Sequence, residues 1–308
     1  MKSSRARVAA MLLWVFPALT GCMSFRPDWN STGSAAHAAR GVVDAELARA
    51  REASQRAVDV SGLRAAMAAY EKVLVEDPQN YDALVTLANH AILMGTAYTE
   101  APDAKRKLYV LAMRLGERAM YTNPEFKGLA DGGARPWEAC GVLTEREMSA
   151  MMVWMTALLY NFKECMSSPV RVFNIRWMTH LDPMLDRMEQ LDESWEEGAV
   201  PFTRAFYYFV VPRSLGGDRD KAASSFARAV ELGPNRLVIR WGRARFFDVL
   251  TKNRKVFVDD LQWVATRDPE ACSDAPAWKA YVQRDANALL QKADHLFGPS
   301  GAVPRSGI

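Results

Sequence analysis

The chain has 308 residues, of which 49% are hydrophobic and 24% are charged, and its formal net charge at pH 7 is +3. This apolar content excludes a disordered protein and is enough for a large core in one elongated or two compact domains. Lys2, Arg5 and Arg7 account for the whole net charge, so the rest of the chain is neutral and gives no electrostatic reason to expect nucleic acid as a partner.

The first 21 residues have the pattern of a lipoprotein signal peptide. Their basic start is followed by an apolar stretch at 8–19 that is too short for a permanent membrane span, and then by Leu19-Thr20-Gly21-Cys22. This tetrapeptide resembles a bacterial lipobox, in which the peptidase cuts before the cysteine and the thiol carries diacylglycerol. Cys22 is therefore the predicted lipidation site. A secretory signal with an incidental cysteine is the alternative.

The predicted membrane is the outer one. Met23 follows the cysteine, and Asp, which would resemble the inner-membrane retention signal, is absent from that position. Residues 22–40 are predicted to be the lipidated cysteine and a flexible tether, because this stretch is rich in small and polar residues and has no apolar periodicity.

Residues 41–298 are predicted to form one helical domain, and residues 299–308 a disordered tail. Apolar periodicity near 3.6 residues runs through the domain, and no segment has the alternation of a strand. The helices are expected at about 42–59, 63–76, 81–97, 104–122, 144–167, 171–193, 198–212, 219–232, 236–251, 254–267 and 276–297.

The segment 215–235 contains the best specified helix of the chain. Asp218 can cap its start by accepting a backbone N–H, and Gly233 with Pro234 ends it. One face of this helix is apolar and must pack against another helix. It has the spacing of small and aromatic residues that is typical of the second helix of a tetratricopeptide repeat, in Ala222, Phe226 and Ala229.

Degenerate copies of the same spacing precede Pro78, Pro124 and Pro269. Their matching positions are Ala66, Tyr70 and Val73, then Ala112, Gly116 and Ala119, and finally Phe257, Leu261 and Val264. A helix also precedes each of these segments. We therefore predict an all-α fold of stacked antiparallel helix pairs, a tetratricopeptide-like α-solenoid with degenerate repeats and a concave groove.

The helix at 151–162 is apolar nearly all round. Such a helix is buried beneath other helices or takes part in a subunit contact. The apolar surface of this helix is larger than one face of a solenoid can bury. We therefore expect a homo-oligomer, specifically a homotrimer.

Cys140, Cys165 and Cys272 would share a compartment in which disulfides form. Any one pair could be bridged with one thiol left over, or all three could be small buried side chains, which we favour. No paired CxxC is present and the histidines are scattered singly, so no metal site is predicted.

No catalytic motif stands out, and we predict that the protein is not an enzyme and needs no cofactor. The sequence has no phosphate loop, HExxH or GxSxG. The pair Gly216-Gly217 is interpreted as a turn, since no strand precedes it. Glu193, Glu196 and Glu197 are interpreted as a solvated helix end, against the alternative of a paired general acid and base.

Four polar residues on first helices of pairs are candidates for a partner or ligand groove. Asp82 and Asn89 lie where the concave surface of such repeats usually sits, and simple solvent exposure is the alternative. Arg240 and Arg243 are three residues apart and could bind a carboxylate through bidentate hydrogen bonds, with a solvated basic face as the alternative.

The middle and C-terminal parts of the chain resemble the T component of TRAP transporters, a family of periplasmic tetratricopeptide lipoproteins. The lipobox is similar too. The residues that carry the resemblance are the run 191–199 (Leu-Asp-Glu-Ser-Trp-Glu-Glu-Gly-Ala), the aromatic helix after it, Pro212, Leu215 to Asp218, Lys221, Ala222, Phe226, Ala229 and the run 157–160 (Ala-Leu-Leu-Tyr).

The resemblance implies an all-helical subunit, a trimer with a central channel, and association with the periplasmic solute-binding protein of a TRAP uptake system. We expect a lipid-anchored periplasmic accessory subunit that binds this protein together with a small organic acid or an apolar solute. The alternative is an outer-membrane adaptor lipoprotein for envelope or outer-membrane protein assembly. Gene neighbours would separate the two.

Overall fold

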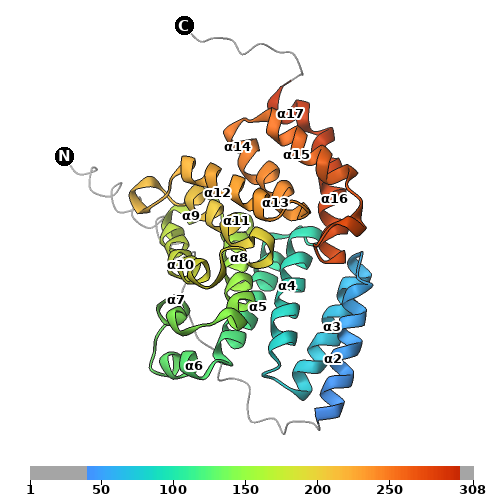
Figure 1. Cartoon of the computed structure of the whole chain (residues 1–308), viewed down its shortest axis with the longest axis vertical. Helices are drawn as coiled ribbons and strands as arrows, with labels where there is room; N and C mark the ends of the chain where they lie inside the picture. Colours follow the sequence, from blue (N-terminus) through green and yellow to red (C-terminus); the bar gives the residue numbers. More distant parts are fainter. Residues whose placement is uncertain (1–39, 299–308) are drawn as a thin grey trace, which may run out of the picture.

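The computed structural model describes residues 40–298 (Figure 1). The predicted signal peptide, Cys22, the tether up to residue 39 and the tail 299–308 lie outside the described residues. The described part is all-α and contains no strand, as the apolar periodicity predicts. No helix within it is both long and apolar enough to cross a membrane.

The N-terminal half contains α2 (Arg40–Gln55), α3 (Val60–Glu76), α4 (Tyr81–Tyr98), α5 (Pro102–Tyr121), α6 (Pro124–Asp131), α7 (Pro136–Ala139), the short 3-10 helices η2 (Cys140–Val142) and η3 (Glu145–Glu147), and α8 (Met148–Cys165). After it come α9 (Ser168–Asn174), the 3-10 helix η4 (Ile175–His180), α10 (Leu181–Asp192), α11 (Trp195–Val210), the 3-10 helix η5 (Arg213–Leu215) and α12 (Arg219–Leu232). The chain continues with α13 (Leu237–Gly242), the π-helix η6 (Arg243–Asp248), α14 (Val249–Thr251), α15 (Arg254–Thr266), the 3-10 helix η7 (Pro269–Ala271), α16 (Pro276–Gln291) and α17 (Ala293–Phe297).

Polar side chains that the sequence shows cap the starts of several helices. Asp218 caps α12 by accepting hydrogen bonds from the backbone nitrogens of Asp220 at 2.9 Å and Lys221 at 3.1 Å, which confirms the predicted cap. Asn80 caps α4 in the same way, accepting from the nitrogen of Ala83 at 3.1 Å. Each such cap satisfies backbone donors that a helix start leaves without a partner.

The residues of the predicted repeat pattern form the contacts between helices. Every one of these positions is buried: Ala66, Tyr70, Val73, Ala112, Gly116, Ala119, Ala222, Phe226, Ala229, Phe257, Leu261 and Val264. At Gly116 a Cβ atom would lie 3.1 Å from the carbonyl oxygen of Ala150. The glycine at the aromatic position of this copy therefore allows α8 to pack closely on α5.

The helices stack in succession and then close back on the start of the chain. α2, α3, α4 and α5 pack on one another in order, and α8 packs on α5 and α4 (Figure 1). In the second half α11 packs on α12, and α13 packs on α15 and α16. α16 also contacts α2 and α4. The solenoid is therefore not open, because its last long helix bridges to its first ones.

The apolar helix predicted at 151–162 is the buried centre of this arrangement. Within α8, residues including Met151, Trp154, Met155 and Leu158 have no exposed surface. The indole nitrogen of Trp154 donates to Glu117 on α5 at 3.1 Å. Burial within one chain thus accounts for most of the apolar surface of this helix, while Met152, Leu159 and Tyr160 are only partly buried.

Three stretches differ from the helices predicted by periodicity. The helix expected at 171–193 is divided into α9, η4 and α10, and on η4 the His180 ring stacks on Trp137 with ring centres 3.9 Å apart. The segment 236–251 changes from α-helix to π-helix at Arg243. Two short helices, α6 and α7, begin at prolines after residue 123, where no helix was expected. Apolar spacing continues through such breaks, so it does not reveal them.

The three cysteines of the described part are free and buried. Burial raises the pKa of the Cys140 thiol to about 11 and that of Cys165 likewise to about 11. The sequence left open either one disulfide or three buried thiols, and the structure has three buried thiols.

Candidate functional site

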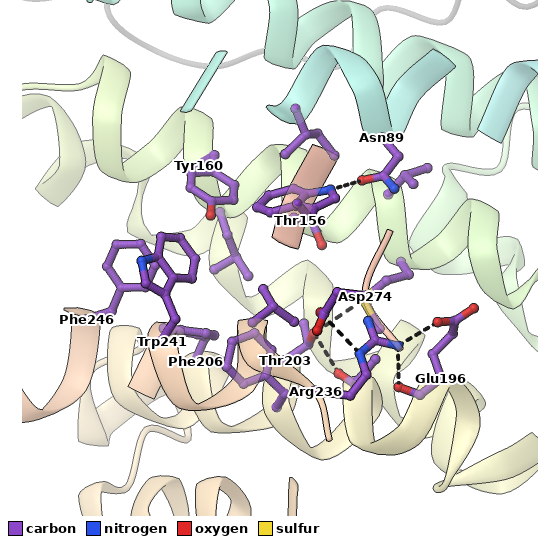
Figure 2. A pocket seen from close by; sticks show the side chains of 18 of the residues that line it. Asn89, Thr156, Tyr160, Glu196, Thr203, Phe206, Arg236, Trp241, Phe246 and Asp274 are labelled. Atoms are coloured by element: carbon purple, nitrogen blue, oxygen red, sulfur yellow. Dashed lines mark hydrogen bonds and ion pairs between the residues drawn. The ribbon is translucent and has the colours of Figure 1, made fainter. Parts of the chain in front are cut away.

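A cavity of about 610 Å³ lies between the N-terminal helices α4 and α8 and the C-terminal elements α11, α13, η6 and α16 (Figure 2). This volume is in the range typical of small-molecule sites, roughly 300–1,000 Å³. The wall is mainly apolar and aromatic. Its large aromatic side chains are Tyr160, Phe162, Trp195, Phe202, Phe206, Phe209, Trp241, Phe246 and Trp278.

Two helices, α8 and α11, supply most of the wall, and their cavity-facing residues recur at helical spacing. On α8 these residues include Met152, Thr156, Tyr160 and Lys163. On α11 they include Ala199, Phe202, Phe206 and Val210. Because residues three and four apart share one helix face, each helix presents one stripe to the cavity and the opposite side to the core.

The start of α11 contains a left-handed turn that lies at the cavity. Glu196, Glu197 and Gly198 have φ values of 49°, 50° and 91°. At Gly198 a Cβ atom would lie 2.6 Å from the carbonyl oxygen of Ala229 on α12. The turn brings Trp195 and Glu196 into the wall, and it stores backbone strain because two of its residues are not glycine.

A polar cluster around Arg236 holds one end of the cavity (Figure 2). The Arg236 guanidinium donates to the Glu196 carboxylate at 2.7 Å and to the Glu196 carbonyl at 3.0 Å. Its Nε also faces Asp274, at 3.5 Å. Asp274 in turn accepts from the backbone nitrogen of Leu237 at 2.6 Å, at the start of α13. Burial raises the pKa of Asp274, and Arg236 opposes this shift. The charges at this end therefore have partners within the chain.

The cation Lys163 lies on the cavity wall beside Phe246. Figure 2 shows Phe246 together with Tyr160 and Trp241 on the opposite side of the cavity from Arg236. The Nζ of Lys163 is 3.2 Å from the centre of the Phe246 ring. Desolvation and the positive charge of Arg245 lower the pKa of Lys163 to about 7. Arg171 on α9 lines the same cavity and donates to the Ser168 hydroxyl at 3.0 Å.

The acidic and metal-ligating side chains of the described part are not gathered in one cluster. Among the described residues, no group of His, Cys, Asp or Glu side chains could hold a metal ion. The acidic residues near residue 195 do not form a pair. Glu193 binds Arg228, Glu196 binds Arg236, and Glu197 accepts from the Ser273 hydroxyl at 2.7 Å. Each carboxylate thus has a separate partner, as expected of charges that hold a turn in place.

The family model for the TRAP transporter T-component matches residues 57–297. The chain belongs to the TRAP transporter T-component family. A search of curated proteins gave no match. The match includes every helix from α4 to α16, and therefore all the elements that form the cavity. It confirms the family that the runs at 157–160 and 191–199 indicate. The family is a transporter component and not a family of enzymes.

The structure of this T-component places one of the predicted groove residues at the cavity. Asn89 lines it, and its side-chain oxygen accepts a hydrogen bond from the indole nitrogen of Trp278 at 3.0 Å (Figure 2). Asp82, on the same helix, is outside the lining and forms an exposed ion pair with Arg51.

Arg240 and Arg243 bind a carboxylate, as their spacing suggests, but the carboxylate belongs to this chain. Arg243 donates to the two oxygens of Asp260 at 2.7 and 2.8 Å, and Arg240 donates to one of them at 3.0 Å. The Asp260 side chain is only 2% exposed. The pair joins η6 and α13 to α15 outside the cavity lining. A contact between these arginines and a partner protein remains a prediction.

Sequence reasoning missed the polar residues that the cavity does contain. Lys163 follows the apolar run of α8, and local spacing marks it only as a cation near a helix end. Trp278 reaches the cavity because α16 folds back on α4, and Arg236 lies there because it pairs with Glu196 at the start of α11. The one usable signal was Lys163 at three residues after Tyr160, on the face that also carries Met152 and Thr156.

Proposed function

We propose that this T-component is a lipid-anchored accessory subunit in the periplasm that docks the solute-binding protein of a TRAP transporter. It holds a small organic acid or an apolar solute in the cavity between α8 and α11. The family match supports a place in a TRAP system. The observation that carries the solute part is the mainly apolar cavity of about 610 Å³.

The partner is proposed to dock over the rim of the cavity. Leu250 on α14 lines the cavity and is 66% exposed, so this part of the wall reaches the surface. Stacked helix pairs present extended surfaces suited to a protein partner. Since partners that meet transiently bury small interfaces, on the order of 1,200 Å² or less, we expect micromolar affinity.

Calorimetric titration with the solute-binding protein encoded nearest this gene tests the docking. We expect saturable binding with a Kd in the micromolar range. Absence of binding up to several hundred micromolar would remove the proposed role and favour the adaptor alternative. A solute-binding protein from an unrelated uptake system is the matched control, and it should give no heat of binding.

The lipid anchor is proposed at Cys22. A diacylglycerol on the thiol with a further acyl chain on the new N-terminus supplies the two apolar signals needed for stable membrane residence. Cys22→Ser should release the protein into the soluble fraction. Continued membrane fractionation and palmitate labelling of that variant would refute the lipobox interpretation.

The subunit is proposed to form a homotrimer, as the family resemblance implies. The side chains of Val172 and Phe173 on α9 are 72% and 71% exposed, and such neighbouring apolar side chains suit a contact between copies. Light scattering on residues 23–308 should give the mass of a trimer, and a monomer at micromolar concentration would contradict it.

A further inference from the structure

The cavity has two ends that differ in how their charges are satisfied. At one end, Arg236 is held by Glu196 and Asp274, so its charge is neutralised within the chain. At the other end, the Lys163 ammonium lies over the face of Phe246 and has no carboxylate partner among the described residues. A cation that faces an aromatic ring inside an apolar wall keeps its capacity to bind an anion.

Glu164, the acidic residue next to Lys163 in the sequence, already has two partners within the chain. It accepts from Lys105 at 2.7 Å and from the Tyr109 hydroxyl at 2.6 Å. The other charged groups that act on Lys163 are the cations Arg245, Arg171 and Lys105. Arg245 is paired with Asp285, whereas Arg171 hydrogen-bonds only the Ser168 hydroxyl within the described part. This end of the cavity is therefore net positive.

We propose that the cavity binds an organic acid with an apolar body, and that the carboxylate of this acid pairs with the ammonium of Lys163. The apolar body lies along the aromatic wall toward the Arg236 end, past Phe206 (Figure 2). The inference rests on the proposed function and deepens it, because it selects the acid over an uncharged solute and locates its head group.

Arg171 is the second cation for the same head group. It lines the cavity from α9, and its charge acts on Lys163. Two cations without carboxylate partners repel each other, and a bound carboxylate would relieve that repulsion. An uncharged solute of the same shape would leave it in place, so the site discriminates by charge.

The test measures displacement of an uncharged fluorescent dye, N-phenyl-1-naphthylamine, from the mature chain carrying Cys22→Ser. The two competitors are decanoate and decan-1-ol, which share an apolar body and differ in the charge of the head. We expect decanoate to bind about tenfold more tightly than the alcohol at pH 6, because a charge-assisted hydrogen bond contributes that much.

Variants assign this preference to the lysine. Lys163→Met should abolish the preference for decanoate and leave the affinity for decan-1-ol within about twofold, because only the charge is removed. Lys163→Arg keeps the cation and should retain the preference. Lys107→Met, which removes an exposed lysine on α5 outside the cavity, should behave as the unaltered chain.

The pH profile gives a second readout. A bound carboxylate raises the pKa of Lys163, so the affinity for decanoate is full below the value of about 7 in the empty site and falls as pH rises above it. The affinity for decan-1-ol should stay constant from pH 6 to 9, and Lys163→Arg should lose the pH dependence for decanoate.

Equal affinity for decanoate and decan-1-ol, or a preference that survives Lys163→Met, would overturn the inference. Failure of both competitors and the dye to bind would overturn it together with the solute part of the proposed function. Docking of the solute-binding protein is measured separately by calorimetry, so its failure is distinguishable from either result.

Discussion

Trp278 on α16 donates a hydrogen bond from its indole nitrogen to the side-chain oxygen of Asn89 on α4, at 3.0 Å, across 189 residues of sequence. Both side chains line the cavity. The bond therefore links the closing helix of the solenoid to its beginning at the point where the two enclose a space. Closure of the helix stack and formation of the cavity are one structural event.

Trp278→Phe should lower the free energy of unfolding by about 1 kcal/mol more than Trp263→Phe does, because both variants replace an indole with a smaller phenyl ring and only Trp278 loses a hydrogen bond. Urea unfolding followed by circular dichroism measures this. Trp263→Phe is the control, since the Trp263 indole has no hydrogen-bond partner in the described part. Equal losses for the two variants would show that the Asn89 bond contributes nothing specific.

Arg243→Met should destabilise the protein by about 1.5–3 kcal/mol, because Asp260 is buried and loses two charge-assisted hydrogen bonds. A solvated basic face would instead give almost no change. Thermal unfolding compared with Arg213→Met, an exposed arginine at the start of η5, is the measurement. A Tm for Arg243→Met equal to that of the control would contradict the structural role.

Asp248→Asn should stabilise the protein more at pH 8 than at pH 5. Burial raises the pKa of Asp248 from 3.8 to about 7, Arg243 opposes the shift and Asp260 adds to it. Between pH 3.8 and about 7, Asp248 keeps a proton in the folded chain and has lost it in the unfolded chain. Stability therefore falls as the pH rises toward 7. The amide removes this penalty. An identical gain in Tm at both pH values would contradict the raised pKa.

Gly198→Ala should cost about 1–3 kcal/mol, because a Cβ atom at φ 91° is strained and would meet the Ala229 carbonyl oxygen. Gly128→Ala in α6 is the matched control: a Cβ atom there meets nothing within 4 Å, and alanine favours a helix. The expected order of Tm is Gly128→Ala at or above the unaltered chain and Gly198→Ala below it. The reverse order would refute the strained turn.

The fold was predictable to the extent that local patterns determine it. Asp218 caps α12, and Phe226 is buried at the aromatic position of the repeat, because both roles depend on residues within one helix and its turn. The turn at Glu196 and Glu197 was not predictable, since glutamate gives no signal for positive φ.

The site was less accessible to sequence reasoning because it depends on pairings between distant helices. Arg240 and Arg243 have the spacing to bind a carboxylate, but only the packing of α15 shows that Asp260 already occupies them. Lys163 was not among the predicted site residues, although it lies at the cavity. Its helix was predicted, while its place on a cavity wall depends on η6 bringing Phe246 to it.

Photo-crosslinking from the rim of the cavity tests the central claim most directly. A benzoylphenylalanine in place of Leu250, which is 66% exposed and lines the cavity, should capture the solute-binding protein in intact cells. The same group in place of Val75, which is 71% exposed on α3 outside the cavity lining, should not capture it. Capture from position 75 alone, or from neither position while the complex is present, would contradict docking over the cavity.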